Sequence, residues 1–130
     1  MTTTTTTTTY TPVAGCSPVS HSDAAAYHRR WLLVDAESRW ISDPEVLARI
    51  EPDIRFGYLV LQAPGMLRLD VPLDVIEDDD SVRLNVVVGS QNVDAVDEGD
   101  VAATWASACL GITCRLVKVH PDAAPVQWPA

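Results

Sequence analysis

The sequence predicts a mainly β protein, an antiparallel β-barrel with one packed α-helix near the C-terminus. Short runs of β-favouring residues recur at close spacing between turn signals, which is typical of barrels and sandwiches. The helical period of apolar residues is clear in one stretch, residues 99–110. A chain of 130 residues, 47% of them hydrophobic, is large enough for one such domain and leaves no room for a second.

The first half of the chain predicts strands and one hairpin. Residues 10–13 and 29–35 are apolar and β-favouring, and the turn at 36–39 leads into a short strand at 40–41. Residues 46–50 follow Asp43-Pro44 and fit either a strand or a helical turn. We favour a strand there.

The middle of the chain continues the meander. The Pro64-Gly65 pair favours a tight turn between strands at 58–61 and 67–71. Two further strands are expected at 82–88 and 93–96, and a final one at 114–119.

The predicted helix has recognisable ends. Asp97 is expected as its N-cap, Asp100 suits the first turn, and Gly111 can adopt the left-handed conformation that ends a helix. Its spacing predicts one apolar stripe, made of Val101, Ala102, Trp105, Ala108 and Cys109.

Composition restricts the function classes. The net charge of -9 makes this an acidic protein, which excludes nucleic acid as an expected partner because phosphate backbones would be repelled. No apolar run approaches the length of a membrane span, so no membrane association is expected, and no signal-peptide pattern opens the chain. We therefore expect a cytoplasmic protein whose three cysteines are reduced thiols.

Three segments are distinguished by composition. Residues 1–9 contain a Thr tract that we expect to be a disordered tail, residues 10–120 form the barrel domain, and residues 121–130 form a Pro-rich tail. The acidic run Glu77 to Asp80 lacks the ligand spacing of a calcium loop, so a solvated turn is the preferred interpretation.

Two segments carry a resemblance to a known family. One is Tyr27-His28-Arg29-Arg30-Trp31, which runs into an apolar strand to Asp35, and the other spans residues 94–117 with the predicted helix and final strand. Between them lies Ala63-Pro64-Gly65-Met66 with the strand that follows it. Over residues 10–120 the chain resembles the N-terminal β-barrel domain of the MOSC family of molybdenum-cofactor proteins, the group that includes the C-terminal part of molybdenum cofactor sulfurase and amidoxime-reducing components.

The resemblance implies a function. In that family the barrel precedes a catalytic domain whose cysteine ligates molybdenum, and the pyranopterin cofactor lies between the two domains. No counterpart of the catalytic domain follows here, which implies a stand-alone accessory or substrate-recognition module without catalysis of its own. A molybdenum-cofactor protein or a separate MOSC domain is the implied partner.

Two other hypotheses stay open. A protein-interaction domain without a cofactor could dock on a separate partner, or on itself, through the surface that a catalytic domain would cover. An independent hydrolase or transferase has the least support because no acid, base or nucleophile constellation stands out.

The resemblance also implies site residues. The family's barrel contacts the cofactor through a Tyr-Pro-x-Lys-Ser/Gly-Cys loop, which here ends in Ala14-Gly15-Cys16, so that Ala14 replaces the lysine. The family's Asp-Arg pair is here His28-Arg29, and the interval from Cys16 to Arg29 is shorter than in the family. Gly15, Cys16 and Arg29 are therefore the implied cofactor-binding residues, in weak contact with molybdopterin.

Arg29 is the residue on which ligand binding chiefly depends. Its guanidinium group suits bidentate phosphate binding, and the alternative is a surface ion pair with the abundant carboxylates. Because neighbours on a strand point to opposite faces, we expect only one of Arg29 and Arg30 to face a given site.

No catalytic or metal-binding residue is predicted. Cys16 has no basic neighbour that would lower its pKa, and Cys109 and Cys114 are expected to be small buried apolar residues because their spacing is not that of a metal site. The three histidines, at 21, 28 and 120, also lack metal-ligand spacing. Trp31 and Trp105 are expected in the core.

Overall fold

A computed structural model describes residues 9–20, 22–73, 83–120 and 123–128. The helices within these residues are the 3-10 helix η1 (Ser22–Tyr27), α1 (Pro44–Leu47) and α2 (Asp100–Leu110). The strands are β1 (Trp31–Asp35), β2 (Glu51–Arg55), β3 (Tyr58–Gln62), β4 (Leu69–Pro72), β5 (Arg83–Val88), β6 (Gln91–Asp97) and β7 (Cys114–Val119). The Thr tract up to residue 8 and the acidic run at 77–80 lie outside the described residues.

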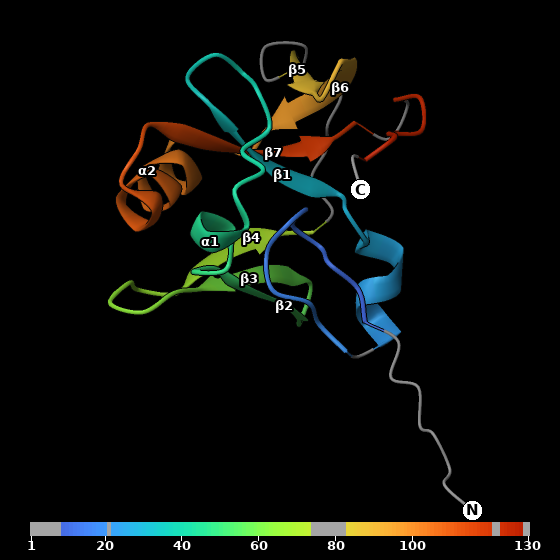
Figure 1. Ribbon diagram of the computed structural model, residues 1–130. Helices are drawn as coiled ribbons and strands as arrows, with labels where there is room; N and C mark the ends of the chain where they lie inside the picture. Colours follow the sequence, from blue (N-terminus) through green and yellow to red (C-terminus); the bar gives the residue numbers. More distant parts are fainter. Residues whose placement is uncertain (1–8, 21, 74–82, 121–122, 129–130) are drawn as a thin grey trace, which may run out of the picture.

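Two antiparallel sheets form the frame of the described chain (Figure 1). One has the strand order β1-β7-β6-β5 and the other the order β2-β3-β4. In the first sheet, β1 pairs with β7 so that Trp31 faces Lys118 and Asp35 faces Cys114. The mainly β fold with one principal helix near the C-terminus is therefore confirmed.

The four-stranded sheet is closed toward a barrel by the turn after β1. The Asp35 carboxylate accepts hydrogen bonds from the Glu37 and Arg39 amides, which reverses the chain. Trp40 then pairs with β1 at Val34, while Arg39 pairs with β5 at Val87. The short strand predicted at 40–41 is thus present as isolated bridges, and it links the two edges of the sheet.

α2 forms where the apolar period predicts it, but its buried stripe differs from the predicted one. Val101 is 77% exposed and Ala108 is exposed, whereas the buried residues are Ala102, Ala103, Trp105, Ala106 and Leu110. The small alanines let the helix approach β7 closely, so the contact face rotates toward them. Gly99 is the N-cap, and Asp97 accepts the Gly99 amide at 2.9 Å, while Gly111 ends the helix with φ +73°.

The segment after residue 42 corrects one prediction and supplies a missed strand. The strand favoured at 46–50 is wrong, because Asp43 accepts the Glu45 amide and Pro44 opens the short helix α1. β2 begins directly after this helix and pairs with β3. Cap chemistry prevailed over the β-favouring residues in this short run.

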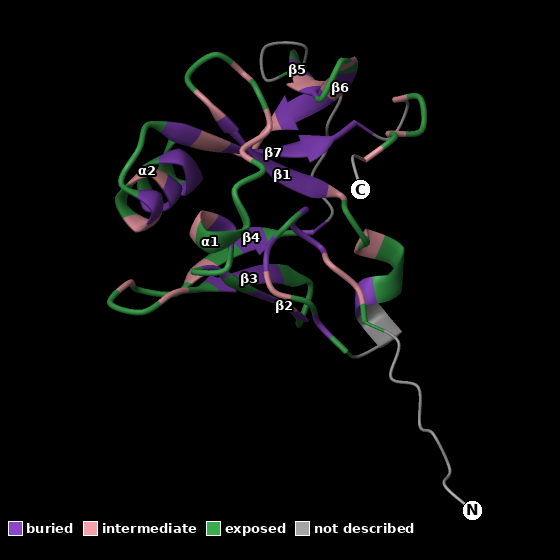
Figure 2. Ribbon diagram, in the orientation of Figure 1, coloured by how far each residue is buried: buried purple, intermediate pink, exposed green. Residues whose placement is uncertain are grey.

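Two hydrophobic clusters fill the two faces of the first sheet (Figure 2). The larger lies between the sheets and includes Trp31, Leu33 and Trp105, so the two predicted core tryptophans are confirmed. The second lies on the opposite face and includes Leu32, Val34 and Val117. Burial of both faces explains why β1 has a continuous apolar run from Trp31 to Val34.

The two ends of the described chain lie against this frame. The strand predicted at 10–13 is reduced to single bridges, from Tyr10 to Val19 and from Val13 to Trp31. Residues 123–128, within the predicted C-terminal tail, pack against the second cluster through Val126 and Trp128. We call residues 123–128 the C-terminal strap.

Candidate functional site

The two segments that carry the predicted site residues lie side by side. The Arg29 amide donates to the Thr11 carbonyl at 2.7 Å, and the Trp31 amide donates to the Pro12 carbonyl at 3.0 Å. The Ala14 amide in turn donates to the Trp31 carbonyl at 2.8 Å. The loop that ends in Cys16 is therefore attached by its backbone to the arginine segment.

Gly15 has a structural reason to be glycine. Its φ of +87° is in the left-handed region, and a Cβ there would lie 2.4 Å from Leu47 Cδ1. Leu47 is itself 1% exposed, so it has little room to move. Gly15 thus lets the loop pass closely over α1. This accounts for the glycine by packing alone, without a bound ligand.

Cys16 points into the core. It is 6% exposed and belongs to the larger hydrophobic cluster. Burial, and to a smaller extent Cys109, raises the pKa of the Cys16 thiol to about 12. Because nucleophiles and metal ligands need the thiolate, this environment favours an inert, protonated thiol.

Arg29 and Arg30 precede β1 in a turn and both line one cavity. Arg29 has φ +54°, and β1 begins only at Trp31, so the predicted strand starts two residues late. Both arginines line the same cavity of about 290 Å³. Strand alternation, on which the expectation of one facing arginine depended, does not apply here because both residues precede β1.

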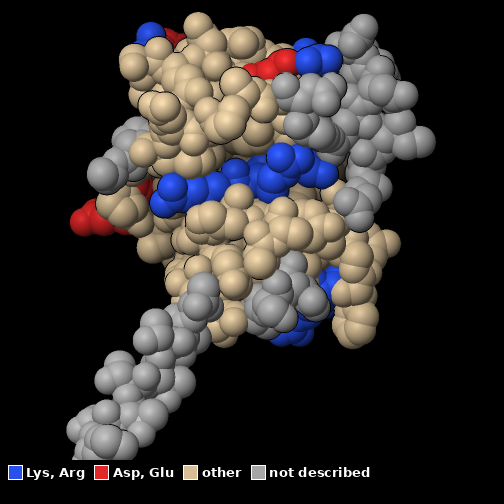
Figure 3. All heavy atoms as spheres, turned by 90° about the vertical axis from the view of Figure 1, so that its right-hand side faces the viewer, with Lys and Arg blue, Asp and Glu red and all other residues tan. Residues whose placement is uncertain are grey.

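The cavity has two different walls. One carries His28, Arg29, Arg30, Val119 and His120, and the other is the C-terminal strap, which contributes Ala123, Ala124, Pro125, Val126 and Trp128. We call this cavity the arginine pocket. Figure 3 views the side on which η1 and the strap lie in Figure 1, and it shows a band of Lys and Arg side chains across the middle of this face.

An aromatic ladder supports one arginine. Arg29 Cζ lies 5.9 Å from the centroid of the Trp128 ring, which is a cation–π contact. Trp128 meets Trp40 edge to face at 5.1 Å, and the Trp40 indole donates to the Ala14 carbonyl at 3.4 Å. Contacts through Ala14 in the loop, Trp40 in the turn after β1 and Trp128 in the strap thus connect these three segments next to Arg29.

The ion pairs between described residues include neither Arg29 nor Arg30, and Arg49 is likewise outside them. Five other arginines, Arg39, Arg55, Arg68, Arg83 and Arg115, each pair with an aspartate or glutamate. Among the residues that the structure describes, no carboxylate forms an ion pair with Arg29 or Arg30. The alternative of a surface ion pair for Arg29 therefore has no support within that part of the chain.

His28 is held beside the arginines as an acceptor. Its Nδ1 accepts the Thr11 amide at 2.9 Å, which requires that this nitrogen carry no proton. Burial, together with the charge of Arg29, lowers the pKa of His28 below its usual value. Neutral His28 lets the two guanidinium groups dominate the charge of the pocket.

Lys118 is a buried cation that the sequence interpretation missed. It is 5% exposed, donates to the Leu73 carbonyl at 2.6 Å and lies 5.4 Å from the Trp31 ring centroid. It shares the inward face of β7 with Cys114 and Leu116. The sequence offered one signal for this burial, since Lys118 lies two residues after Leu116 on the predicted strand and therefore on the same face. This lysine links the two sheets.

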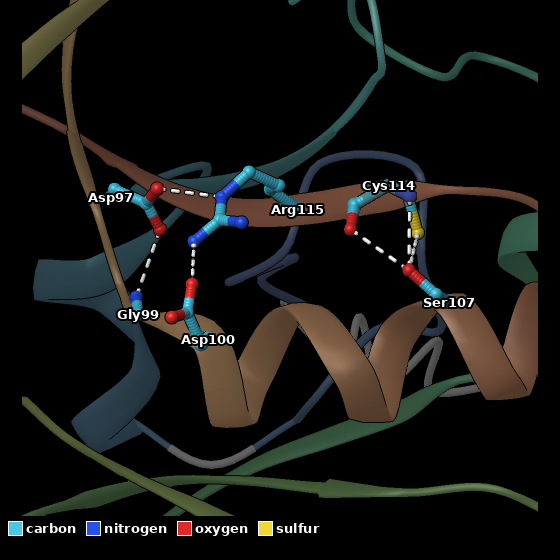
Figure 4. A network of polar contacts seen from close by, with 6 residues as sticks. All are labelled: Asp97, Gly99, Asp100, Ser107, Cys114 and Arg115. Carbon is cyan, nitrogen blue, oxygen red and sulfur yellow. Dashed lines mark hydrogen bonds and ion pairs between the residues drawn. The ribbon is translucent and has the colours of Figure 1, made fainter.

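A second polar region behaves differently from the arginine pocket (Figure 4). Arg115 Nε donates to Asp97 at 2.6 Å, and its Nη2 donates to Asp100 at 2.8 Å. Ser107 accepts the Cys114 amide and donates to the Cys114 carbonyl, both at 3.0 Å. We call these residues, with Gly99, the α2–β7 network. A cavity of about 560 Å³ lies beside it, but its arginine is already committed to carboxylates.

The geometry indicates anion binding more than metal binding. No group of three or more His, Cys, Asp or Glu within the described residues is arranged to hold a metal ion. Burial raises the pKa values of the Cys109 and Cys114 thiols. Cys114 is buried as predicted, whereas Cys109 is only partly buried. No described helix is long and apolar enough to cross a membrane.

A family model for the MOSC N-terminal beta barrel domain matches residues 5–113. The chain belongs to this family. The match includes the loop with Gly15 and Cys16, the arginine segment and α2, whereas the C-terminal strap lies beyond it.

Two relatives of this MOSC N-terminal domain are molybdenum cofactor sulfurases. The human protein is 29% identical over 96 residues, which are 71% of this chain and 11% of that protein. The Danio rerio protein is 31% identical over 102 residues, which are 74% of this chain and 12% of that protein. The chain therefore spans about a tenth of the length of these relatives.

A solved structure resembles this MOSC N-terminal domain over nearly its whole length. It is the solution structure of a Bordetella bronchiseptica protein, 53% identical, with a TM-score of 0.82. The similarity covers 97% of this chain and 98% of that one. The two chains thus share a fold and a similar extent.

Proposed function

We propose that this MOSC N-terminal domain is an accessory module that binds the phosphate-bearing end of a pyranopterin molybdenum cofactor in its arginine pocket, without catalysis of its own. One observation carries the proposal. In a protein of net charge -9, two adjacent arginines line one pocket and have no carboxylate partner among the described residues. Guanidinium groups left unpaired in an acidic protein are suited to a phosphate.

The residues present fit one part of the cofactor. Arg29 and Arg30 would hold the phosphate, and the apolar strap would exclude water from one side of it. Cys16 is a buried neutral thiol, and Ala14 is 1% exposed and has no donor side chain. The loop would therefore contribute to the form of the site but add no charge to it. The bound cofactor would supply redox chemistry at its metal, with a metal ligand coming from a molybdenum-cofactor protein or a separate MOSC domain.

Amide shifts in the isotope-labelled protein test this proposal. Adding molybdopterin or a phosphorylated pterin should shift the amides of residues 28–30 and the indole N–H of Trp128. Arg29→Ala should remove the response. Arg68→Ala, which deletes the same charge from the ion pair with Asp70, should leave it unchanged. Unshifted amides at 28–30 with millimolar ligand would refute cofactor binding.

A second candidate function is a protein-interaction domain without a cofactor, and Phe56 favours it. Phe56 and Gly57 form the turn between β2 and β3 with φ of +51° and +81°. Such turns favour Asn-Gly, and a bulky residue in the left-handed region is strained. Phe56 is nevertheless 96% exposed. A cavity of about 670 Å³ lies beside it, lined by Tyr27, Ile54 and Leu73 among others.

Replacing the exposed phenylalanine tests the second candidate. Phe56→Asn should improve the turn and abolish binding to a separately purified MOSC domain or to a second copy. Leu67→Asn is the control, since Leu67 is 87% exposed at another turn. A strictly monomeric protein in sedimentation, with no MOSC domain bound, would exclude this function.

A further inference from the structure

The C-terminal strap is held by three hydrogen bonds and by apolar packing. The Gln91 side chain donates to the Pro125 carbonyl at 3.2 Å and accepts the Gln127 amide at 2.9 Å. The Ala123 amide donates to the His120 carbonyl at 2.9 Å, which turns the chain back. Val126 and Trp128 then pack on the second hydrophobic cluster. Residues 123–128 are therefore a built part of the described fold.

Trp128 holds Arg29 at the mouth of the arginine pocket. Its ring lies under the guanidinium group and against Trp40, and Trp40 is fixed in turn by its amide, which donates to the Val87 carbonyl at 2.8 Å. An exposed arginine side chain otherwise samples many rotamers, and ordering it before binding removes that cost. Trp128 thus acts on Arg29 by preorganisation.

The two walls of the pocket point to one class of ligand. The wall that carries Arg29 and Arg30 is cationic, whereas the strap wall is made of alanine, proline, valine and tryptophan. The cavity of about 290 Å³ is at the small end of ligand pockets. A phosphate ester with a flat apolar ring can contact both walls at once.

We propose that the strap is the second wall of the anion site, that Trp128 is a positioning residue for Arg29, and that the site takes a phosphate ester whose ring lies against the strap. This inference rests on the proposed function, because it concerns the same pocket. It goes further by assigning a role to residues beyond the MOSC N-terminal match and by naming the part of the ligand that the strap would contact.

Two small probes measure the contribution of each wall. Inorganic phosphate reports on the arginines alone, and phenyl phosphate reports on the arginines and the strap together. In the full chain, phenyl phosphate should bind about 10-fold more tightly than inorganic phosphate, as expected for burying one ring face. Arg29→Ala should weaken both probes.

Trp128 variants decide whether the strap acts as proposed. Trp128→Ala should weaken the binding of inorganic phosphate, because Arg29 loses the ring beneath it, and should bring the affinity for phenyl phosphate close to that for phosphate. Trp128→Phe should restore most of both losses because a ring remains under Arg29. The near-ultraviolet circular dichroism from the Trp40 and Trp128 pair should vanish in both variants. Arg68→Ala is the control for fold and charge.

The outcomes separate the two proposals. If Trp128→Ala leaves the ratio of the two affinities unchanged while the amides of 28–30 still respond to phosphate, the strap inference is overturned and the anion site stands. If phenyl phosphate binds as expected and a phosphorylated pterin does not, the inference stands and the proposed function is wrong. If neither probe shifts residues 28–30 at millimolar concentration, both are wrong.

Discussion

Arg115 lies between Asp97 and Asp100, whereas Arg29 and Arg30 share a pocket in which no described carboxylate pairs with them. The residue type is the same, and the surroundings differ. Arg115 joins the start of α2 to β7, and its hydrogen bonds with the two aspartates raise the pKa of its guanidinium group. Arg29 rests on an indole ring, which supports its charge without neutralising it.

The difference separates a structural arginine from one available to a ligand. Acidic residues outnumber basic ones by 18 to 9, so an exposed arginine has many possible carboxylate partners. An arginine that pairs with none of them keeps its hydrogen-bond donors available for an anionic ligand. Whether an arginine has a carboxylate partner therefore says more about its availability to a ligand than its position in a family motif does.

Deleting Arg115 should give the largest loss of stability. Arg115→Ala removes two charge-assisted hydrogen bonds, one of them to Asp97, whose side chain is 21% exposed. We expect the free energy of unfolding to fall by about 2 kcal/mol, mostly from the Asp97 contact because Asp100 is 93% exposed. Urea denaturation measures this. Arg68→Ala, on a surface pair, should cost no more than about 0.5 kcal/mol, and an equal loss in both variants would break the comparison.

Ser107 should contribute next to the α2–β7 network. Ser107→Ala leaves the Cys114 amide and carbonyl without their shared hydroxyl partner, although alanine is the better helix former. The net loss should be about 1 kcal/mol, seen as a lower urea midpoint. Thr104→Ala, on the exposed side of α2, should instead stabilise the protein by a few tenths of a kcal/mol. Ser107 is structural only if these two signs differ.

The arginine pocket should show the opposite behaviour. The double variant Arg29→Ala, Arg30→Ala should change the free energy of unfolding by less than about 0.5 kcal/mol. It should, however, lose the stabilisation that phenyl phosphate gives the unmodified protein, about 1.4 kcal/mol at ten times the Kd. Thermal unfolding with and without the ester measures both effects. A large loss of stability without ligand would make these arginines structural, like Arg115.

The frame of the fold was predictable from the sequence because its signals are local. The Pro64-Gly65 turn, the end of α2 at Gly111 and the final strand at 114–119 follow from backbone preferences and apolar patterning, and the structure has all three. α1 was mistaken for a strand because Asp43 and Pro44 decide it and the β-favouring residues do not. The stripe of α2 was misplaced because the partner surface, and not the helix alone, selects the buried alanines.

The candidate site was predictable only in part. Arg29 was singled out from a motif, but Trp128, which contacts it, and His120, which lines the same pocket, are distant in sequence and join it only after folding. Strand alternation did not apply to Arg29 and Arg30 because the chain turns there with a positive φ at Arg29. Cys16 shared the same motif, yet its direction into the core is set by the sheets packed around it.

The smallest expected effect is a pH dependence that only the arginine pocket should show. The pKa of His28 is lowered in the folded protein by burial and by Arg29, so the unfolded chain takes up a proton more readily as the pH falls below about 6.5. His28 should therefore reduce stability between about pH 7 and pH 5, and His28→Gln should show a slightly shallower loss over the same range. Titration by NMR should give His28 a pKa below that of free histidine, and phosphate should raise it because an anion favours the charged imidazolium. A pKa above the free value without ligand would mean that the two arginines do not govern the charge of this pocket.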